Sequence, residues 1–293
     1  MADPDSFLEI DPEAPLTLLD QLHAGKRLML ISNAEWVYVQ RMMSHAFDRW
    51  LPGSMTWNDL FEIVIVGSRK PDFFSSRLPL FSILDPVRGL LEPEPQGIPG
   101  PGWYVGGDAT CGERYLGLSG SEILYVGDHL YGDVHYSKAL RRWRTALILQ
   151  ELETEVHALA EFEPTQARLT ELIDQRQALE TKLGAQQLAR LRAAEGYAVP
   201  LGPGEEHLGS ISETEAELSR LNRSMAPLKD QASRLQNQGW GTLTRAKQDK
   251  SLFFRQIERY ADIYTSRVSN LLFPGPYATF RMGRLPLPHD PRS

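Results

Sequence analysis

Short, nearly continuous apolar runs separated by polar loops characterise the first 150 residues. The runs cover residues 27–31, 61–66, 123–126 and 145–149. Such runs are typical of strands that are buried on both faces of a parallel sheet, with helices crossing between them. Helical spacing predicts these crossing helices over residues 15–24, 36–47 and 136–142. The pattern therefore predicts an α/β fold with a partial Rossmann-like parallel sheet and helices. A Pro- and Gly-rich insert, irregular or a β-hairpin, is expected at about 71–120.

A heptad pattern replaces these runs over residues 151–238. Apolar or small residues recur at alternating steps of three and four, at Ile211, Thr214, Leu218, Leu221, Met225, Leu228, Ala232 and Leu235. A looser version precedes them, at Leu169, Leu172, Leu179 and Leu183. Glycines and prolines between 196 and 204 separate the two stretches. The pattern predicts a long antiparallel helical hairpin, coiled-coil-like, that forms a homo-oligomer. Pro227 is expected to kink its second helix.

The remaining segment, residues 239–293, returns to a globular pattern. Apolar and aromatic residues at helical spacing run from Phe253 to Tyr264, followed by a proline-rich tail. We expect this helix and tail to pack back on the first 150 residues. The domains predicted from sequence are therefore residues 1–150, 151–238 and 239–293.

Charge and cysteine content restrict the function classes. The chain has 293 residues, of which 31 are basic and 38 acidic, so its formal net charge is −7. This charge argues against a protein that coats nucleic acid. The single cysteine, Cys111, allows neither an intrachain disulfide nor a cysteine-built zinc site. No stretch reaches the roughly 18–20 apolar residues of a membrane span. We expect a cytoplasmic protein without membrane or nucleic-acid partners.

Polar residues follow three of the apolar runs directly. Ser32 and Asn33 follow the first run, Lys70 comes after the second, and Asp128 and Asp133 come after the third. Ligands of open parallel sheets bind at the carboxyl ends of the strands, so we expect these side chains to meet in one crevice. A hydroxyl and a lysine suit a phosphate, and carboxylates suit Mg²⁺. Ordinary roles remain open, since Ser-Asn after a strand often caps a helix and aspartates in Gly-rich turns do so too.

The strings around these residues resemble motifs of a known superfamily. Ser32-Asn33, Arg69-Lys70-Pro71 and the stretch from Gly127 to Asp133 resemble the second, third and fourth motifs of haloacid dehalogenase-like (HAD) phosphatases. Longer strings resemble one branch, the cytosolic purine 5′-nucleotidase family; they are residues 125–133, 137–138, 143–145, 69–74, 259–264, 240–241 and 270–272. The resemblance implies a HAD-like core and Mg²⁺-dependent dephosphorylation of nucleoside 5′-monophosphates, with purines preferred.

The same resemblance implies a role for each matching residue. Ser32 corresponds to the hydroxyl that binds the transferring phosphoryl group, and Asn33 helps to orient it. Lys70 corresponds to the catalytic lysine that stabilises the phosphoryl charge. Asp128 corresponds to the magnesium ligand, with Asp133 supporting the metal site. Such positioning and charge stabilisation are how phosphoryl transfer is generally accelerated.

One motif of the superfamily has no match here. It is an Asp-x-Asp-x-Thr/Val string that ends a central strand well before the serine motif and carries the nucleophile and the acid/base. Only 31 residues precede Ser32, and Asp3-Pro4-Asp5 follows no apolar strand. We therefore expect the nucleophile and cap to lie outside this sequence, which would be the C-terminal portion of a nucleotidase without turnover by itself. The alternatives are a pseudoenzyme that binds nucleotide or phosphate, and an oligomerisation module built on the hairpin.

Overall fold

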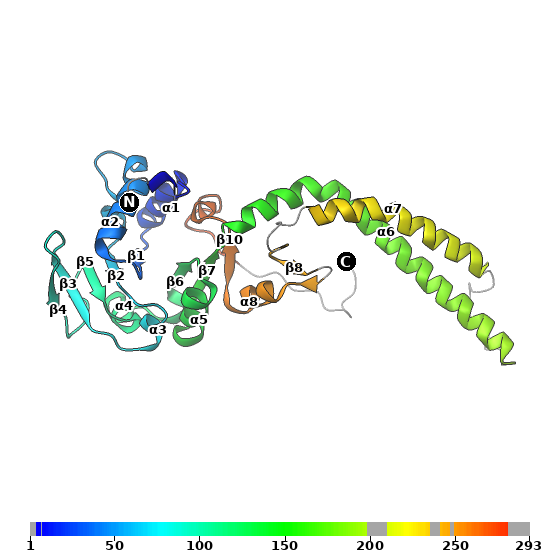
Figure 1. Ribbon diagram of the computed structural model, residues 1–293. Coiled ribbons are helices and arrows are strands. Elements are labelled where there is room, and N and C mark those ends of the chain that lie inside the picture. Colours follow the sequence, from blue (N-terminus) through cyan, green and yellow to red (C-terminus); the bar gives the residue numbers. More distant parts are fainter. Residues whose placement is uncertain (1–3, 7, 198–209, 235–240, 247–248, 281–293) are drawn as a thin grey trace. The chain divides into compact units, whose positions relative to one another are not determined.

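A computed structural model describes residues 4–6, 8–197, 210–234, 241–246 and 249–280. The chain divides into two compact units (Figure 1). The first unit comprises Met1–Gln150 together with Leu252–Ser293, and the second comprises Glu151–Ser251. The boundary predicted at 238/239 lies inside the second unit.

A five-stranded mixed sheet forms one half of the first unit. Its order is β1 (Met29–Ile31), β2 (Ile63–Val66), β5 (Gly102–Gly106), β3 (Leu80–Asp85) and β4 (Leu90–Pro93). The first three strands of that order are parallel, whereas β3 runs antiparallel to both β5 and β4. All four residues of β2 are buried, as its unbroken apolar run predicts. The predicted insert contains the β3–β4 hairpin. It also contributes β5 to the interior of this sheet and two helices, at Asp72–Ser75 and Ala109–Leu116, which the sequence did not indicate.

A three-stranded parallel sheet forms the other half. Its order is β10 (Ile263–Thr265), β7 (Arg144–Ile148) and β6 (Leu124–Gly127). Helical spacing predicted a helix as far as Tyr264, but α8 ends at Tyr260 and the chain continues as β10. The Asp262 carboxylate accepts a hydrogen bond from the Thr145 backbone N–H at 2.9 Å, which fixes the end of the helix against β7. The C-terminal part thus joins the first unit by adding a strand.

Helices surround the two sheets of the first unit in the described residues (Figure 1). Their bounds are α1 (Glu13–His23), α2 (Trp36–Phe47), α3 (Asp72–Ser75), α4 (Ala109–Leu116), α5 (Tyr136–Arg141) and α8 (Leu252–Tyr260). A π-helical turn covers Leu130–His135. Buried side chains from both sheets share one core, in which the Phe74 ring lies edge-on to Tyr125 at 5.2 Å and to Trp143 at 5.8 Å. Aromatic pairs in this geometry add to the apolar burial and hold the two halves together.

Each sheet has two outer strands without a further partner strand among the described residues, β1 and β4 in the first sheet and β6 and β10 in the second. The outer edges of β1 and β6 are the two that concern the site. In a parallel ladder, alternate residues direct their backbone groups to opposite neighbours. The Ser32 N–H donates to Ile65 of β2, so the backbone of Ile31 faces away from β2. The β1 and β6 edges are where strand order diverges, since the next strand in sequence is β2 in one sheet and β7 in the other. They therefore mark a topological switch point, where open α/β sheets bind ligands.

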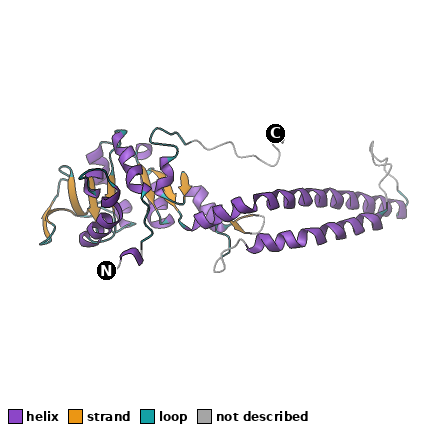
Figure 2. Cartoon of the chain, turned by 90° about the horizontal axis from the view of Figure 1, so that it is seen from above, coloured by secondary structure: helices purple, strands orange, loops and turns teal. Residues whose placement is uncertain are grey.

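The second unit is dominated by two long helices that lie side by side and run in opposite directions (Figure 2). They are α6 (Glu151–Ala194) and α7 (Ile211–Arg234). From 211 to 232, the predicted heptad positions are all buried or half-buried and every other residue is exposed. Leu169, Leu172 and Met225 form a core between the helices. Leu235 lies outside the described residues, and Pro227 lies within α7. The short strands β8 (Arg245–Ala246) and β9 (Asp249–Lys250) pair in this unit.

The predicted α/β class with parallel strands and a long helix is thus confirmed. Among the helices of the described ranges, none combines the length and apolar character that crossing a membrane requires.

Candidate functional site at the switch point

The loop after β2 is held by the segment that follows β1. The Gly67 N–H donates to the Ala34 carbonyl at 2.9 Å, and the Ser68 N–H donates to the Ser32 carbonyl at 3.0 Å. The Asn33 side chain makes three further bonds. Its Oδ1 accepts from Ser68 Oγ at 2.9 Å and from the Lys70 N–H at 2.6 Å, and its Nδ2 donates to the Lys70 carbonyl at 3.1 Å. These bonds join the ends of two neighbouring strands.

The backbone of this loop is unusual at Arg69. Its φ is +58°, in the left-handed region that residues with a side chain rarely adopt. The conformation turns the chain so that the N–H of the next residue, Lys70, points back to Asn33. Residues held in such conformations cluster at functional sites, where the surrounding contacts maintain them.

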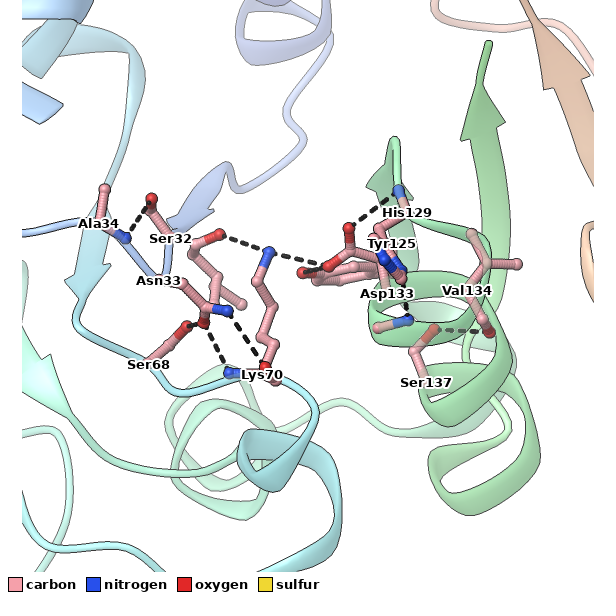
Figure 3. Close-up of polar contacts among 12 residues, drawn as sticks. Ser32, Asn33, Ala34, Ser68, Lys70, Tyr125, His129, Asp133, Val134 and Ser137 are labelled. Atoms are coloured by element: carbon pink, nitrogen blue, oxygen red, sulfur yellow. Dashed lines mark hydrogen bonds and ion pairs between the residues drawn. The ribbon is translucent and has the colours of Figure 1, made fainter.

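The Lys70 side chain extends from the loop after β2 and places its ammonium between the end of β1 and the loop after β6 (Figure 3). Its Nζ donates to the Ile31 carbonyl at the open edge of β1 at 3.3 Å, and it lies 2.8 Å from Asp133 Oδ1. The two side chains are only 15% and 5% exposed. The ammonium also lies 5.8 Å from the centre of the Tyr125 ring. Lys70 is therefore a largely desolvated cation between the two open edges.

Asp133 uses both carboxylate oxygens in contacts within the protein. Oδ1 accepts from the Tyr125 hydroxyl at 3.1 Å in addition to Lys70, and Oδ2 accepts from the His129 N–H at 3.2 Å. Burial raises the pKa of the Tyr125 hydroxyl, and the negative charge of Asp133 raises it further, so tyrosine stays protonated and donates. Gly127 allows this approach, since a Cβ there would lie 2.6 Å from the Asp133 Cβ. Asp133 is thus occupied by Lys70 and Tyr125.

Asp128 differs from Asp133 in its surroundings. It is exposed, and within the described ranges its carboxylate has no hydrogen-bond or ion-pair partner. It directly follows β6, at the carboxyl end of the strand. In the part of the chain that the structure describes, no group of three or more His, Cys, Asp or Glu residues could hold a metal ion. At this place, the described part of the chain therefore has one free carboxylate that could bind a cation.

Ser32 lies at the end of β1 with its hydroxyl half-buried. Ser32 Oγ accepts a hydrogen bond from the Ala34 N–H at 3.1 Å. Because this bond uses the oxygen as acceptor, the hydroxyl proton is available for an anion. The structure therefore brings Ser32, Asn33, Lys70 and Asp133 to one place, as expected for residues at the ends of neighbouring strands.

Comparison with known proteins identifies the chain. A family model described as the 5′ nucleotidase family matches residues 1–292. The chain belongs to the 5′ nucleotidase family. A 5′-nucleotidase domain-containing protein of Dictyostelium discoideum is 27% identical over 273 residues, which cover 91% of this chain and 41% of that protein. The chain thus spans less than half the length of this relative.

Asp5, from the Asp-x-Asp string near the start of the chain, lies away from the site. Asp3 is outside the described residues, and Asp5 Oδ1 lies 2.7 Å from His45 Nε2. His45 is in the last turn of α2, whereas Ser32 precedes the first turn of that helix. Nine residues separate Trp36 from His45, which corresponds to roughly 14 Å along a helix. Asp5 is therefore not a neighbour of Lys70.

Two contacts of the candidate site were not foreseen from the sequence. Tyr125 was read only as part of an apolar strand, although its hydroxyl binds Asp133. Ser68 is fully buried and binds Asn33. The signal for Tyr125 was its polar end within a buried run, because a buried tyrosine hydroxyl usually finds a partner. The signal for Ser68 was its place in the loop between a strand and Lys70.

Proposed function

We propose that this chain binds nucleoside 5′-monophosphates, preferentially purine ones, and contributes to the hydrolysis of their phosphate ester in a HAD-like, Mg²⁺-dependent 5′-nucleotidase. The observation that carries the proposal is Lys70, a largely desolvated cation fixed at the switch point between two open strand edges. Family membership supports the reaction class.

Three side chains would receive the phosphate in this proposal. The Ser32 hydroxyl donates to a phosphoryl oxygen, with Asn33 beside it. Lys70 supplies positive charge next to the phosphoryl group and so stabilises its negative charge during transfer. Preorganised donors and cations in a site of low exposure account for much of the acceleration of phosphoryl transfer.

The metal fits the residues in a limited way. Mg²⁺ binds through one or two carboxylates and takes its remaining ligands from water and phosphate. The free carboxylate of Asp128 would hold the ion, which when bound neutralises phosphate charge. Asp133 would support the metal site without binding the ion directly, since Lys70, Tyr125 and the His129 N–H already engage both of its oxygens.

We further propose that the carboxylate nucleophile and the acid/base come from a segment outside this sequence. Within the described ranges, Asp133 is the carboxylate that pairs with Lys70, and its binding to Tyr125 and His129 leaves it poorly placed to attack. The open edges of β1 and β6 lie on either side of Lys70, where a strand could pair with both. The Dictyostelium relative contains much more chain than the matched part, which is consistent with this proposal.

Phosphate release from a purine nucleoside 5′-monophosphate with Mg²⁺ tests the proposal. For this chain by itself we expect no release above a protein-free blank. We expect release when the chain is produced with an upstream in-frame segment that encodes an Asp-x-Asp-x-Thr strand. Mg²⁺-dependent release by this chain without that segment, lost in Asp128→Asn and kept in the control Asp174→Asn, would show that the nucleophile lies inside the sequence.

The second candidate is a nucleotide-binding protein without hydrolysis. The pairing of Lys70 with Asp133 favours it, because the cation is already neutralised. Binding of nucleotide without release, even after an Asp-x-Asp-x-Thr segment is supplied, would support this candidate. For the α6–α7 hairpin we propose homo-oligomerisation in a cytoplasmic protein, which sedimentation of the purified chain tests directly.

A further inference from the structure

The Asn33 amide is committed to the loop that carries Lys70. Its oxygen accepts two hydrogen bonds and its nitrogen donates one, all to residues 68–70. This pattern also defines which way the amide points, because two donors face the oxygen and a carbonyl faces the nitrogen. An asparagine whose oxygen is saturated in this way has one remaining N–H for a ligand.

Two of the three bonds go to the backbone of Lys70 itself, to its N–H and to its carbonyl. They fix the peptide groups on both sides of the Lys70 Cα. The preceding residue, Arg69, has the left-handed φ of +58°, a conformation that surrounding contacts must maintain. The far end of the Lys70 side chain is fixed separately, by the Ile31 carbonyl and Asp133.

We propose that Asn33 is a positioning residue that acts through Lys70, by holding the backbone from which the ammonium reaches the open edge of β1. Its contribution to phosphate binding is then indirect. The expected effect on phosphate binding rests on the proposed function, but the hydrogen bonds that hold Lys70 are present without substrate. The direct contact with phosphate falls to Ser32 and Lys70.

Proton exchange of the Lys70 ammonium, followed by NMR in the ligand-free chain, tests the proposal. The signal is assigned by its loss in Lys70→Arg. We expect Asn33→Ala to speed this exchange about tenfold or more, because the ammonium loses its fixed position beside Ile31 and Asp133. Ser68→Ala removes one of the three bonds and should give a smaller increase. Asn33→Asp keeps an acceptor for two of the three bonds and should fall between wild type and Asn33→Ala.

Ser32→Ala is the matched control, since it removes a hydroxyl next to Asn33 without touching the loop bonds of the amide. It should leave Lys70 exchange unchanged and weaken binding of inorganic phosphate, measured by calorimetry. Asn33→Ala should change both. The proposal is overturned if Asn33→Ala weakens phosphate binding while Lys70 exchange stays at the wild-type rate, because Asn33 then acts as a direct ligand.

Two further outcomes are distinguishable. If wild type binds no phosphate but Asn33→Ala speeds Lys70 exchange, the proposed function fails and the positioning of Lys70 by Asn33 stands. If Asn33→Ala does not fold, Ser68→Ala decides the question. Faster exchange in that variant supports the proposal, and exchange at the wild-type rate contradicts it.

Discussion

Gly127→Ala should disrupt the contact between Asp133 and Lys70 by steric displacement. A Cβ at position 127 would lie 2.6 Å from the Asp133 Cβ, 2.8 Å from its Cγ and 2.9 Å from its Oδ2. To reach ordinary contact, the two Cβ atoms must separate by 0.8 Å, from 2.6 to 3.4 Å. The backbone of Gly127 is not left-handed, so the expected destabilisation comes from lack of space and not from backbone strain.

The displacement has a calculable consequence. The Lys70–Asp133 distance of 2.8 Å has little tolerance, and a shift of that size would take it beyond hydrogen-bond range. Breaking a buried ion pair by removing a partner costs roughly 3–5 kcal/mol, and overpacking costs roughly 1–3 kcal/mol. Because Asp133 can relax in part, we expect a loss of about 2–4 kcal/mol in the unfolding free energy of the first unit.

Urea unfolding followed by tryptophan fluorescence measures this loss. Five of the six tryptophans, Trp36, Trp50, Trp57, Trp103 and Trp143, lie in the first unit, so fluorescence reports on it. Circular dichroism reports the helices of the second unit in parallel. This separation is needed because a chain with two units need not unfold in one step.

Two variants control the interpretation. In an Asp133→Gly background the opposing Cβ is absent, so the cost of Gly127→Ala should fall below about 1 kcal/mol, which a double-mutant cycle measures. Gly184→Ala lies in α6 with open space around it, and it should stabilise the second unit by about 0.5–1 kcal/mol through helix propensity. An equal cost of Gly127→Ala with and without the Asp133 side chain would refute the steric argument.

Three further predictions concern other contacts. Tyr125→Phe removes the hydroxyl that donates to the Asp133 carboxylate and should lower the unfolding free energy by about 1–2 kcal/mol, measured by urea unfolding; an unchanged midpoint would contradict it. Met225→Ala opens a cavity in the α6–α7 core and should cost about 2–5 kcal/mol in the second unit, seen by circular dichroism. The Arg27 guanidinium holds the pKa of Glu62 below its usual value of 4.5, so its stabilising contribution is present above that pH and is lost as pH falls through the lowered pKa. Glu62→Gln should therefore flatten stability against pH in that acidic range, and an unchanged pH profile would argue against the contribution.

The sequence pattern predicted those strands and helices whose formation depends on neighbouring residues in the chain. The buried run Ile63–Val66 became β2, and the heptad positions from Ile211 to Ala232 became the inner face of α7. Strand β5 was missed because its three apolar residues lie between glycines in a Pro- and Gly-rich stretch. Strand β10 was missed because helical spacing continues through it, and the contact that stops the helix, Asp262 with Thr145, joins residues 117 positions apart.

The candidate site was predictable in its composition but not in its contacts. The ends of strands gave Ser32, Lys70 and the two aspartates. Which aspartate pairs with lysine depends on the space at Gly127 and on the hydroxyl of Tyr125. Both residues lie in the motif strings, but the strings do not show that they contact Asp133. Pairing across two sheets is decided by tertiary packing, so sequence spacing could not separate the occupied Asp133 from the free Asp128.

Binding of a purine nucleoside 5′-monophosphate in the presence of Mg²⁺, measured by calorimetry on the purified chain, tests the central claim most directly. We predict that wild type binds, that Ser32→Ala and Lys70→Met each weaken binding about tenfold or more, and that the control Lys182→Met on α6 leaves it unchanged. Circular dichroism of each variant confirms that it is folded. The claim is contradicted if wild type does not bind, or if folded Ser32→Ala and Lys70→Met bind as tightly as wild type.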